Sequence, residues 1–425
     1  MSFANSPIRT SADKEHLYCE SCDLRSVAET FGTPLYVYSR AKLRECASHW
    51  NEATKNAKAR VFYAMKANSS KAILQEFLSA GIGFDIVSGG ELARALAAGA
   101  NPKNIVYSGV GKRSDEIQAA LLADILCFNI ESEAELYRVS AIANDLGKTA
   151  NISFRVNPDV DAKTHPYIST GLKRNKFGIP FQDAFDLYKI AASLPGIRIS
   201  GIDAHIGSQL TEISPFVDSL EKLLNIVDRL QAAGIFLDHV DIGGGLGICY
   251  TTENPPHIEN LVQSLQNKLT SRGHGDLSLY FEPGRSLVAS CGLLLTRVEY
   301  LKANESKNFC IVDASMTEMI RPALYQAEMP LFNCTVRKDL PHDWEIVGPV
   351  CESGDWLAKN QALAVRAGDV LVMPNAGAYG MSMASTYNSR VFPAEVMIDG
   401  DKALLIRERS TVEDLMQLER SLPTD

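Results

Sequence analysis

The sequence predicts an α/β fold, in which a (β/α)8 TIM barrel is followed by a second, all-β C-terminal domain of the β-sandwich or barrel-like type. Three observations support this prediction. The chain has 425 residues, which is long for one ordinary domain. Between residues 60 and 285, short β-branched runs alternate with amphipathic helical stretches. After about residue 287, strand-like runs continue without long helical patterns between them.

The alternating region contains eight candidate strands, each followed by a turn. They are residues 60–67, 82–88, 104–110, 125–132, 151–158, 197–207, 237–245 and 277–285. Helical patterns between them, such as 70–80 and 90–100, carry apolar residues at three- and four-residue spacing. Ser88 and Glu91 have the spacing of a capping box before one of these helices. Eight such units fit a closed barrel better than an open doubly wound sheet.

The C-terminal part shows six short strand-like segments. They are residues 308–315, 331–337, 344–352, 370–376, 393–399 and 402–409. Asp399 and Gly400 between the last two predict a hairpin turn. We therefore place a cofactor-binding barrel domain at 37–286 and a β-rich domain at 287–425, and we expect residues 1–36 to pack with the latter.

Composition excludes several classes of protein. The formal net charge of −9 argues against a nucleic-acid or anionic-membrane partner. No apolar signal begins the chain, and the uncharged run 370–389 contains proline, asparagine and glycine residues that make it a poor membrane span. Nine scattered cysteines, an odd number, fit a reducing compartment, so we expect a cytoplasmic enzyme. Cys19 and Cys22 form a C-x-x-C pair without a second ligand pair at zinc spacing, so no metal site is expected.

Polar residues gather at the predicted carboxyl ends of four barrel strands, where (β/α)8 enzymes place their chemistry. Lys66 ends the first strand and His205 the sixth, a glycine run at 243–245 follows the seventh, and Glu282 and Arg285 end the eighth. Each feature has an ordinary structural explanation: a lysine that reaches solvent, a core histidine, a glycine turn and an ion pair. Together they predict a site with a Schiff-base lysine, a phosphate-binding loop, and a carboxylate and an imidazole beside a flat ring.

The order and spacing of these motifs resemble the fold-type III pyridoxal-phosphate decarboxylases, a group that also includes alanine racemase and ornithine decarboxylase. Among them, the chain is most similar to the members that act on meso-diaminopimelate. The resemblance runs from residue 32 to about 396. The motifs are FGTPLYVYS, YAMKAN, GFDIVSGGEL, HPYISTGLKRNKFGI (165–179), HIGSQ, DIGGGLG, EPGR, MIRPALY, GPVCESGD and GAYG.

The resemblance implies a role for each motif residue, with pyridoxal 5′-phosphate as the cofactor. Lys66 would form the Schiff base, and His205 would stack on the pyridine ring. The other cofactor-binding residues would be Ser208, Gly243, Gly244, Gly245, Glu282, Pro283, Gly284, Arg285 and Tyr379. Arg285, Arg321 and Tyr325 would hold the distal carboxylate of the substrate, Glu352 its distal amine, and Tyr379 would touch substrate as well as cofactor. Cys351 would deliver a proton from the partner subunit of an obligate homodimer.

The implied reaction is decarboxylation of meso-2,6-diaminopimelate to L-lysine and CO2, the last step of lysine biosynthesis. Glu282 at the ring nitrogen favours decarboxylation over racemisation, because the related alanine racemases place an arginine there. The nearest alternative is a sister decarboxylase of ornithine, lysine, arginine or carboxynorspermidine; Arg285, Arg321 and Glu352 together argue against the first three. A non-catalytic homologue would be expected to lack Lys66 or Cys351. A cofactor-free aldolase would explain Lys66 alone, and a buried structural role is the ordinary alternative for Cys351.

Overall fold

The computed structural model describes residue 3 and residues 6–160 and 176–422. It divides the chain into two compact units. The first unit comprises residues 1–43, 249–252 and 288–425, and the second comprises 44–248 and 253–287. Residues 37–43 thus belong with the β-rich unit, because β4 (Leu35–Ser39) pairs with strands of its sheet. Residues 165–175 of the predicted HPYISTGLKRNKFGI motif lie outside the described residues.

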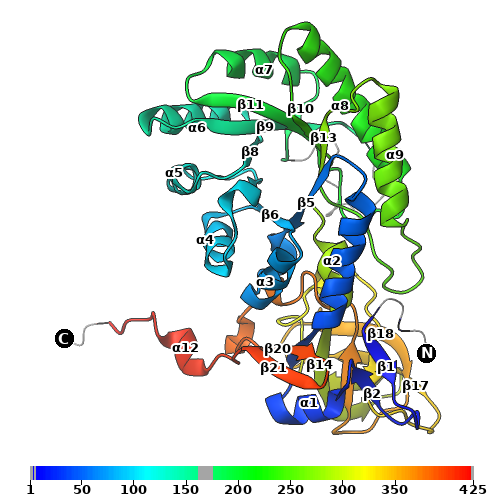
Figure 1. The fold of residues 1–425 in the computed structure, drawn as a ribbon. Coiled ribbons are helices and arrows are strands. Elements are labelled where there is room, and N and C mark those ends of the chain that lie inside the picture. The colour runs from blue at the N-terminus through cyan, green and yellow to red at the C-terminus, as the bar shows by residue number, and fades with distance from the viewer. Residues whose placement is uncertain (1–2, 4–5, 161–175, 423–425) are drawn as a thin grey trace. The chain divides into compact units, whose positions relative to one another are not determined.

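The second unit is a closed barrel of eight parallel strands, as the sequence predicted (Figure 1). The barrel strands are β5 (Ala59–Ala64), β6 (Gly83–Ile86), β7 (Ile105–Tyr107), β8 (Cys127–Ile130), β9 (Ala150–Asn157), β11 (Ile197–Asp203), β12 (His239–Asp241) and β13 (Ser278–Phe281). Each strand pairs with the next in this order, and β13 pairs with β5 to close the barrel. A short β10 (Ile179–Pro180) extends the pairing at β9.

Helices follow the strands along the chain. They are α2 (Arg40–Thr54), α3 (Lys71–Ser79), α4 (Gly89–Ala98), α5 (Ser114–Ala123), α6 (Glu133–Asp145), α7 (Ala184–Ser193), α8 (Ser214–Ala232), α9 (Ile258–Ser271) and the short α10 (Arg285–Val288), with 3-10 turns η1 (Met65–Ala67) and η2 (Pro102–Asn104). The predicted cap is present, since Ser88 Oγ accepts a hydrogen bond from the Glu91 amide at 3.2 Å. Helix α4 ends at Ala98 and is capped by Gly99, whose φ of +100° suits glycine.

The barrel strands are buried over nearly their whole length, and large aromatic side chains such as Phe84, Phe128 and Phe154 are fully buried. The pattern changes at the carboxyl ends, where buried acidic residues replace apolar ones. Burying a carboxylate is costly unless a partner or a proton compensates it. The carboxyl end of the barrel is therefore the part of this unit that packing alone does not explain.

The first unit is built on one mixed sheet in the order β18-β17-β15-β14-β4-β20-β21, with β19 pairing β14 and β16. Its other strands are β14 (Gly292–Ala303), β15 (Asn308–Val312), β16 (Phe332–Asn333), β17 (His342–Val347), β18 (Trp356–Leu363), β19 (Val370–Met373), β20 (Ala394–Asp399) and β21 (Lys402–Arg407). The predicted hairpin joins β20 to β21, with Asp399 opposite Lys402. Strands β4, β14 and β18 were not predicted.

The N-terminal segment packs on this sheet. It forms β1 (Ile8–Thr10), β2 (Leu17–Cys19), β3 (Cys22–Asp23) and α1 (Leu24–Phe31). Leu17, Leu24 and Leu293 share one buried apolar cluster. Cys19 and Cys22 lie opposite each other in the β2–β3 hairpin, and none of the nine cysteines, all of which the structure describes, forms a disulfide.

The remaining elements of the first unit are short. They are α11 (Arg321–Tyr325), α12 (Val412–Met416), η3 (Ala289–Cys291), η4 (Met381–Met383) and η5 (Tyr387–Ser389). Among the residues described, no helix combines the length and the apolar character needed to cross a membrane.

Candidate active site

Lys66 lies just beyond the end of β5, in the 3-10 turn η1. Its Nζ is 3.4 Å from Oδ2 of Asp85, which sits on the neighbouring strand β6. The Asp85 side chain is fully buried, whereas the Lys66 side chain is 38% exposed. A buried carboxylate thus holds an accessible amine at the carboxyl end of the barrel, where it can react with a carbonyl group.

The loop after β12 is made of three consecutive glycines, and its geometry excludes side chains. A Cβ on Gly244 would lie 2.2 Å from the Glu282 carbonyl oxygen. Gly243 and Gly245 have φ values of +68° and +107°, which glycine adopts without strain. Asp241 Oδ1 accepts a hydrogen bond from the Gly243 amide at 2.8 Å. The result is a stretch of backbone without side chains that Asp241 holds in place, and the amide groups of this stretch can surround a phosphate.

His205 follows β11 and contacts the glycine loop. Its Nδ1 accepts a hydrogen bond from the Gly244 amide at 3.1 Å, so the ring is neutral and carries its proton on Nε2. Burial lowers the pKa of His205 well below its usual value, and the positive charges of Arg155 and Lys66 lower it further. An uncharged imidazole beside the loop is suited to lie against a flat aromatic ring.

Glu282, at the end of β13, belongs to a group of buried carboxyls. Oxygens of Glu282, Asp203 and Asp241 lie within 4.8 Å of one another. Glu282 Oε1 accepts hydrogen bonds from Asn129 Nδ2 at 3.2 Å and from Ser108 Oγ at 3.4 Å. Three adjacent carboxyls cannot all be ionised without a large electrostatic cost, so the group holds at least one proton.

The pKa shifts of the three carboxyls agree with this geometry. Burial, followed by the charges of Asp241 and Asp85, raises the pKa of Glu282 well above its usual value. Burial likewise raises the pKa of Asp241 to about 7. Burial and the charge of Asp241 raise the pKa of Asp203. A proton held at this position can be shared with a basic ring nitrogen.

The turn after Glu282 brings the eighth strand against the first. Gly284 lies so close to η1 that a Cβ there would be 3.1 Å from the Ala67 Cβ. The Pro283 carbonyl accepts a hydrogen bond from the Ala64 amide at 3.1 Å. Arg285, 6% exposed, donates through Nη2 to Ser208 Oγ at 2.9 Å. The predicted barrel residues therefore lie at one end of the barrel.

The residues at this end fit pyridoxal phosphate, as orphaned polar atoms show. Asp85 Oδ1, Asp203 Oδ1 and Asp241 Oδ2 are buried and have no hydrogen-bond partner in the described part of the chain. Such acceptors favour a cationic or protonated group nearby. The amine of Lys66, the glycine loop and Glu282 have the chemistry needed to hold an aldehyde, a phosphate and a basic ring nitrogen, the three groups that pyridoxal phosphate carries.

The first unit carries the other predicted residues. Arg321 begins α11 and is 6% exposed; its guanidinium lies 4.5 Å from the centre of the Tyr250 ring. Arg321 Nη1 is also 3.4 Å from Met329 Sδ. Tyr325 ends the same helix. Tyr379 follows β19 with a φ of +56°. The aromatic face and the short helix fix the direction of a buried guanidinium.

Cys351 and Glu352 lie on the loop between β17 and β18. Cys351 is exposed, whereas each of the chain's other eight cysteines is buried or half-buried. Its amide donates to Asn388 Oδ1 at 3.1 Å. Glu352 Oε1 accepts a hydrogen bond from Tyr387 Oη at 2.8 Å, which raises the pKa of Tyr387. An exposed thiol and an oriented carboxylate thus occupy adjacent positions, and Cys351 does not lie in the core of its own chain.

Sequence reasoning missed the acidic residues that surround Glu282, namely Asp85, Asp203 and Asp241. Each is a single carboxylate inside an otherwise apolar strand, a signal that marks a buried polar group. Each of them lies inside a predicted strand, whereas the polar residues that mark a barrel site in a sequence stand at the strand end or in the turn that follows it.

Comparisons with known proteins place the chain among enzymes of one kind. Residues 40–289 match the family model described as the pyridoxal-binding domain of pyridoxal-dependent decarboxylases. The chain is 51% identical over 400 residues to the diaminopimelate decarboxylase of Neisseria meningitidis serogroup A, which covers 94% of this chain and 98% of that protein. It is 50% identical over 408 residues to the diaminopimelate decarboxylase of Pseudomonas fluorescens, covering 96% and 97%. The structure of diaminopimelate decarboxylase from M. jannaschii with L-lysine matches with a TM-score of 0.94 at 37% identity, covering 100% of this chain and 99% of that one.

Proposed function

Because the chain belongs to the diaminopimelate decarboxylase family of pyridoxal-dependent enzymes, we propose that it removes one carboxyl group from meso-diaminopimelate and releases L-lysine and CO2. This is the final step of lysine biosynthesis. The observation that carries the proposal is the gathering of the Lys66 amine, the glycine loop and Glu282 at one end of the barrel. An aldolase that works without a cofactor would need only the first of these.

Pyridoxal 5′-phosphate is the cofactor. The residues proposed to hold it are Lys66, His205, Ser208, Gly243, Gly244, Gly245, Glu282, Pro283, Gly284, Arg285 and Tyr379. When bound, the cofactor accepts the electron pair that loss of CO2 leaves on the α-carbon.

The protein's own residues perform the remaining work. Lys66 Nζ supplies the amine that binds the cofactor aldehyde. Glu282 keeps a proton at the ring nitrogen, helped by its buried carboxyl neighbours. His205, neutral and hydrogen-bonded to Gly244, limits movement of the ring. The Cys351 thiol delivers a proton to the α-carbon after CO2 has left.

Substrate recognition needs groups for a second amino-acid end. We assign the distal carboxylate to Arg285, Arg321 and Tyr325, since a guanidinium can bind a carboxylate through two parallel hydrogen bonds. Glu352 would pair with the distal amine, and Tyr379 would contact substrate and cofactor.

The purified enzyme is expected to release CO2 and lysine from meso-diaminopimelate. The Glu282→Gln variant is expected to turn over about 10²- to 10³-fold more slowly while cofactor remains bound, because an uncharged amide cannot keep the ring nitrogen protonated. The measurement is CO2 release together with the cofactor absorbance of each variant. Glu345→Gln is a matched control, because Glu345 is also buried but pairs with Lys307 on the β-rich sheet. Near-normal turnover by Glu282→Gln would show that the ring nitrogen does not depend on this carboxylate.

We further propose that the enzyme is a cytoplasmic homodimer whose sites are shared, with Cys351 supplied by the partner subunit. The nine cysteines, none of which forms a disulfide, support a reducing compartment. Mixing inactive Lys66→Ala with inactive Cys351→Ala is expected to restore up to about one quarter of the activity, since half of a random mixture is mixed dimers with one complete site each.

The control for this mixing experiment combines Lys66→Ala with the double variant Lys66→Ala, Cys351→Ala, which cannot form a complete site. Subunit exchange is verified independently with differently tagged chains. If exchange occurs and no activity returns, the shared site is refuted.

A further inference from the structure

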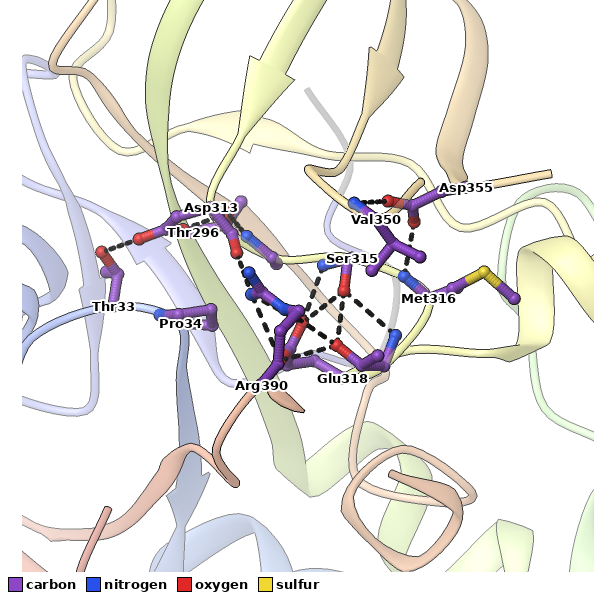
Figure 2. Close-up of polar contacts among 12 residues, drawn as sticks. Thr33, Pro34, Thr296, Asp313, Ser315, Met316, Glu318, Val350, Asp355 and Arg390 are labelled. Carbon is purple, nitrogen blue, oxygen red and sulfur yellow. Dashed lines mark hydrogen bonds and ion pairs between the residues drawn. The ribbon is translucent and has the colours of Figure 1, made fainter. Parts of the chain in front are cut away.

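Three segments of the first unit are joined by hydrogen bonds, and one of them is the loop that carries Cys351 and Glu352. The first is the turn 313–318, which leads into α11 and Arg321. The second is the loop 348–355. The third is the segment 385–390, which includes η5. Figure 2 shows the polar contacts at the base of this arrangement, where Asp355 and Arg390 converge on the turn.

Asp355 bridges the loop and the turn with its two carboxylate oxygens. Oδ2 accepts a hydrogen bond from the Val350 amide at 2.8 Å, and Oδ1 accepts one from the Met316 amide at 2.7 Å. The Asp355 amide in turn donates to the Glu352 carbonyl at 3.0 Å. Because Val350 directly precedes Cys351, one buried side chain closes the loop at its base and fixes it to the turn.

The surroundings leave little room for another arrangement. Asp355 is 4% exposed. A Cβ on Gly348 would lie 2.5 Å from Asp355 Oδ2 and 2.5 Å from the Ser315 Cβ. A carboxylate suits this buried position because its two oxygens can each accept a hydrogen bond from one of the two backbone amides.

Arg390 and Glu318 fix the turn itself. Arg390 Nη2 donates to the Asp313 carbonyl at 2.6 Å, and its Nε donates to Thr317 Oγ1 at 3.1 Å. Glu318 Oε2 accepts hydrogen bonds from the Ser315 amide at 2.8 Å and the Ser315 hydroxyl at 2.9 Å. The turn to which Asp355 is bonded is therefore rigid, so it can serve as a reference point for the loop.

The exposed end of the loop is held from the other side by the segment 385–390. Asn388 Oδ1 accepts a hydrogen bond from the Cys351 amide, and Tyr387 Oη donates a hydrogen bond to Glu352 Oε1. The Ser385 amide bonds the Thr317 carbonyl at 3.0 Å, which links this segment to the same turn. Cys351 and Glu352 are thus held by contacts at both ends of their loop, although both are exposed.

We propose that Asp355, Tyr387 and Asn388 are positioning residues that set the places of the Cys351 thiol and the Glu352 carboxylate. This inference rests on the proposed roles of Cys351 in proton delivery and of Glu352 in binding the distal amine. Asp355 accepts a hydrogen bond from the Val350 amide and Asn388 accepts one from the Cys351 amide, so both fix the backbone that leads into Cys351. Tyr387 instead orients the Glu352 carboxylate. A displacement of about 1 Å at a reacting group can cost 10²-fold in rate, so these contacts matter for turnover as well as for folding.

The test compares Asp355→Asn with Asp369→Asn in the holoenzyme. Both change a buried carboxylate that accepts a backbone amide in the same unit, but the partners of Asp369 are Asn333, Arg337 and Arg366. In Asp355→Asn an amide NH2 must face one of the two backbone amides. We expect kcat to fall about 10-fold or more, by displacement of the thiol, while cofactor absorbance per subunit stays unchanged.

Alkylation by iodoacetamide provides a readout independent of turnover, because Cys351 is the exposed cysteine of the chain. We expect Asp355→Asn to alkylate about threefold faster or more at Cys351, as its loop is freed, and Asp369→Asn to react like the wild type. If Asp355→Asn and Asp369→Asn have the same kcat and the same rate of Cys351 alkylation, Asp355 stabilises the fold but does not position Cys351, and the proposal is refuted. If the wild type does not turn over meso-diaminopimelate at all, the proposed function is refuted, whereas the alkylation rates still report whether Asp355 holds the loop of Cys351.

Two surface variants test the same proposal if Asp355→Asn does not fold. Asn388→Gly removes the acceptor for the Cys351 amide, and glycine suits its φ of +57°; it should lower kcat and speed alkylation. Tyr387→Phe removes only the hydroxyl that orients Glu352; it should raise KM for meso-diaminopimelate about threefold or more, with kcat and alkylation unchanged. Wild-type values of kcat, KM and alkylation in both variants would overturn the proposal.

Discussion

Replacing Lys66 with alanine is expected to abolish turnover of meso-diaminopimelate, by about 10³-fold or more, together with the visible absorbance of the cofactor-bound protein. Lys66 presents a 38% exposed side chain beside the buried Asp85 carboxylate. Lys112, another lysine of the barrel, cannot replace it, because its Nζ is fully buried and donates to Glu135, Asn129 and Gly109. Absorbance spectra and CO2 release measure the two losses separately.

The matched control is Lys103→Ala, which removes an exposed lysine that pairs with Asp124 on the outside of the same unit. It should keep both turnover and absorbance, since an exposed ion pair contributes about 1 kcal/mol or less to stability. A Lys66→Ala protein that kept both would end the assignment of Lys66 as the Schiff-base lysine.

The eight barrel strands could be predicted because each is a compact apolar run with a turn after it, a local signal. Strand β14 could not, although its 12 residues make it long for a strand. Its first half, GLLLT, lies between β4 and β19 and is buried throughout, so no alternation marks it as a strand. Strand β4 was recognised as part of a motif, but its pairing with β14 and β20 joins segments hundreds of residues apart, which no local pattern reports.

The predicted site had the same limitation. Lys66, His205 and Glu282 could be found because each interrupts an apolar pattern near the end of a strand. The cluster of three carboxyls, Asp203, Asp241 and Glu282, forms only when β11, β12 and β13 come together in the closed barrel. Likewise, Asp355 belongs to a motif visible in the sequence, yet its bond to Met316 depends on the folding of the whole unit.

Arg321→Ala is expected to lower kcat/KM for meso-diaminopimelate about 10²- to 10³-fold while the cofactor absorbance stays intact. The guanidinium is buried, lies over the Tyr250 ring and carries a charge that lysine or ornithine, with no distal carboxylate, cannot satisfy. The wild type should therefore discriminate against those amino acids by about 10⁴- to 10⁵-fold, as sites do when they are built to hydrogen-bond a substrate group that the wrong substrate lacks. Steady-state kinetics with the three amino acids measure both effects.

Two further variants separate substrate binding from general damage. Arg366→Ala removes an exposed arginine that pairs with Asp339 in the same unit, and it should leave the kinetics unchanged. Arg321→Lys keeps the charge but loses the planar pair of donors, so it should recover only part of the activity. Because alanine removes the charge that repels a distal amine, Arg321→Ala should also reduce the ratio of kcat/KM for meso-diaminopimelate to kcat/KM for lysine. Ready turnover of lysine or ornithine by the wild type would refute the assignment of meso-diaminopimelate as the substrate, since neither amino acid offers the Arg321 guanidinium a distal carboxylate.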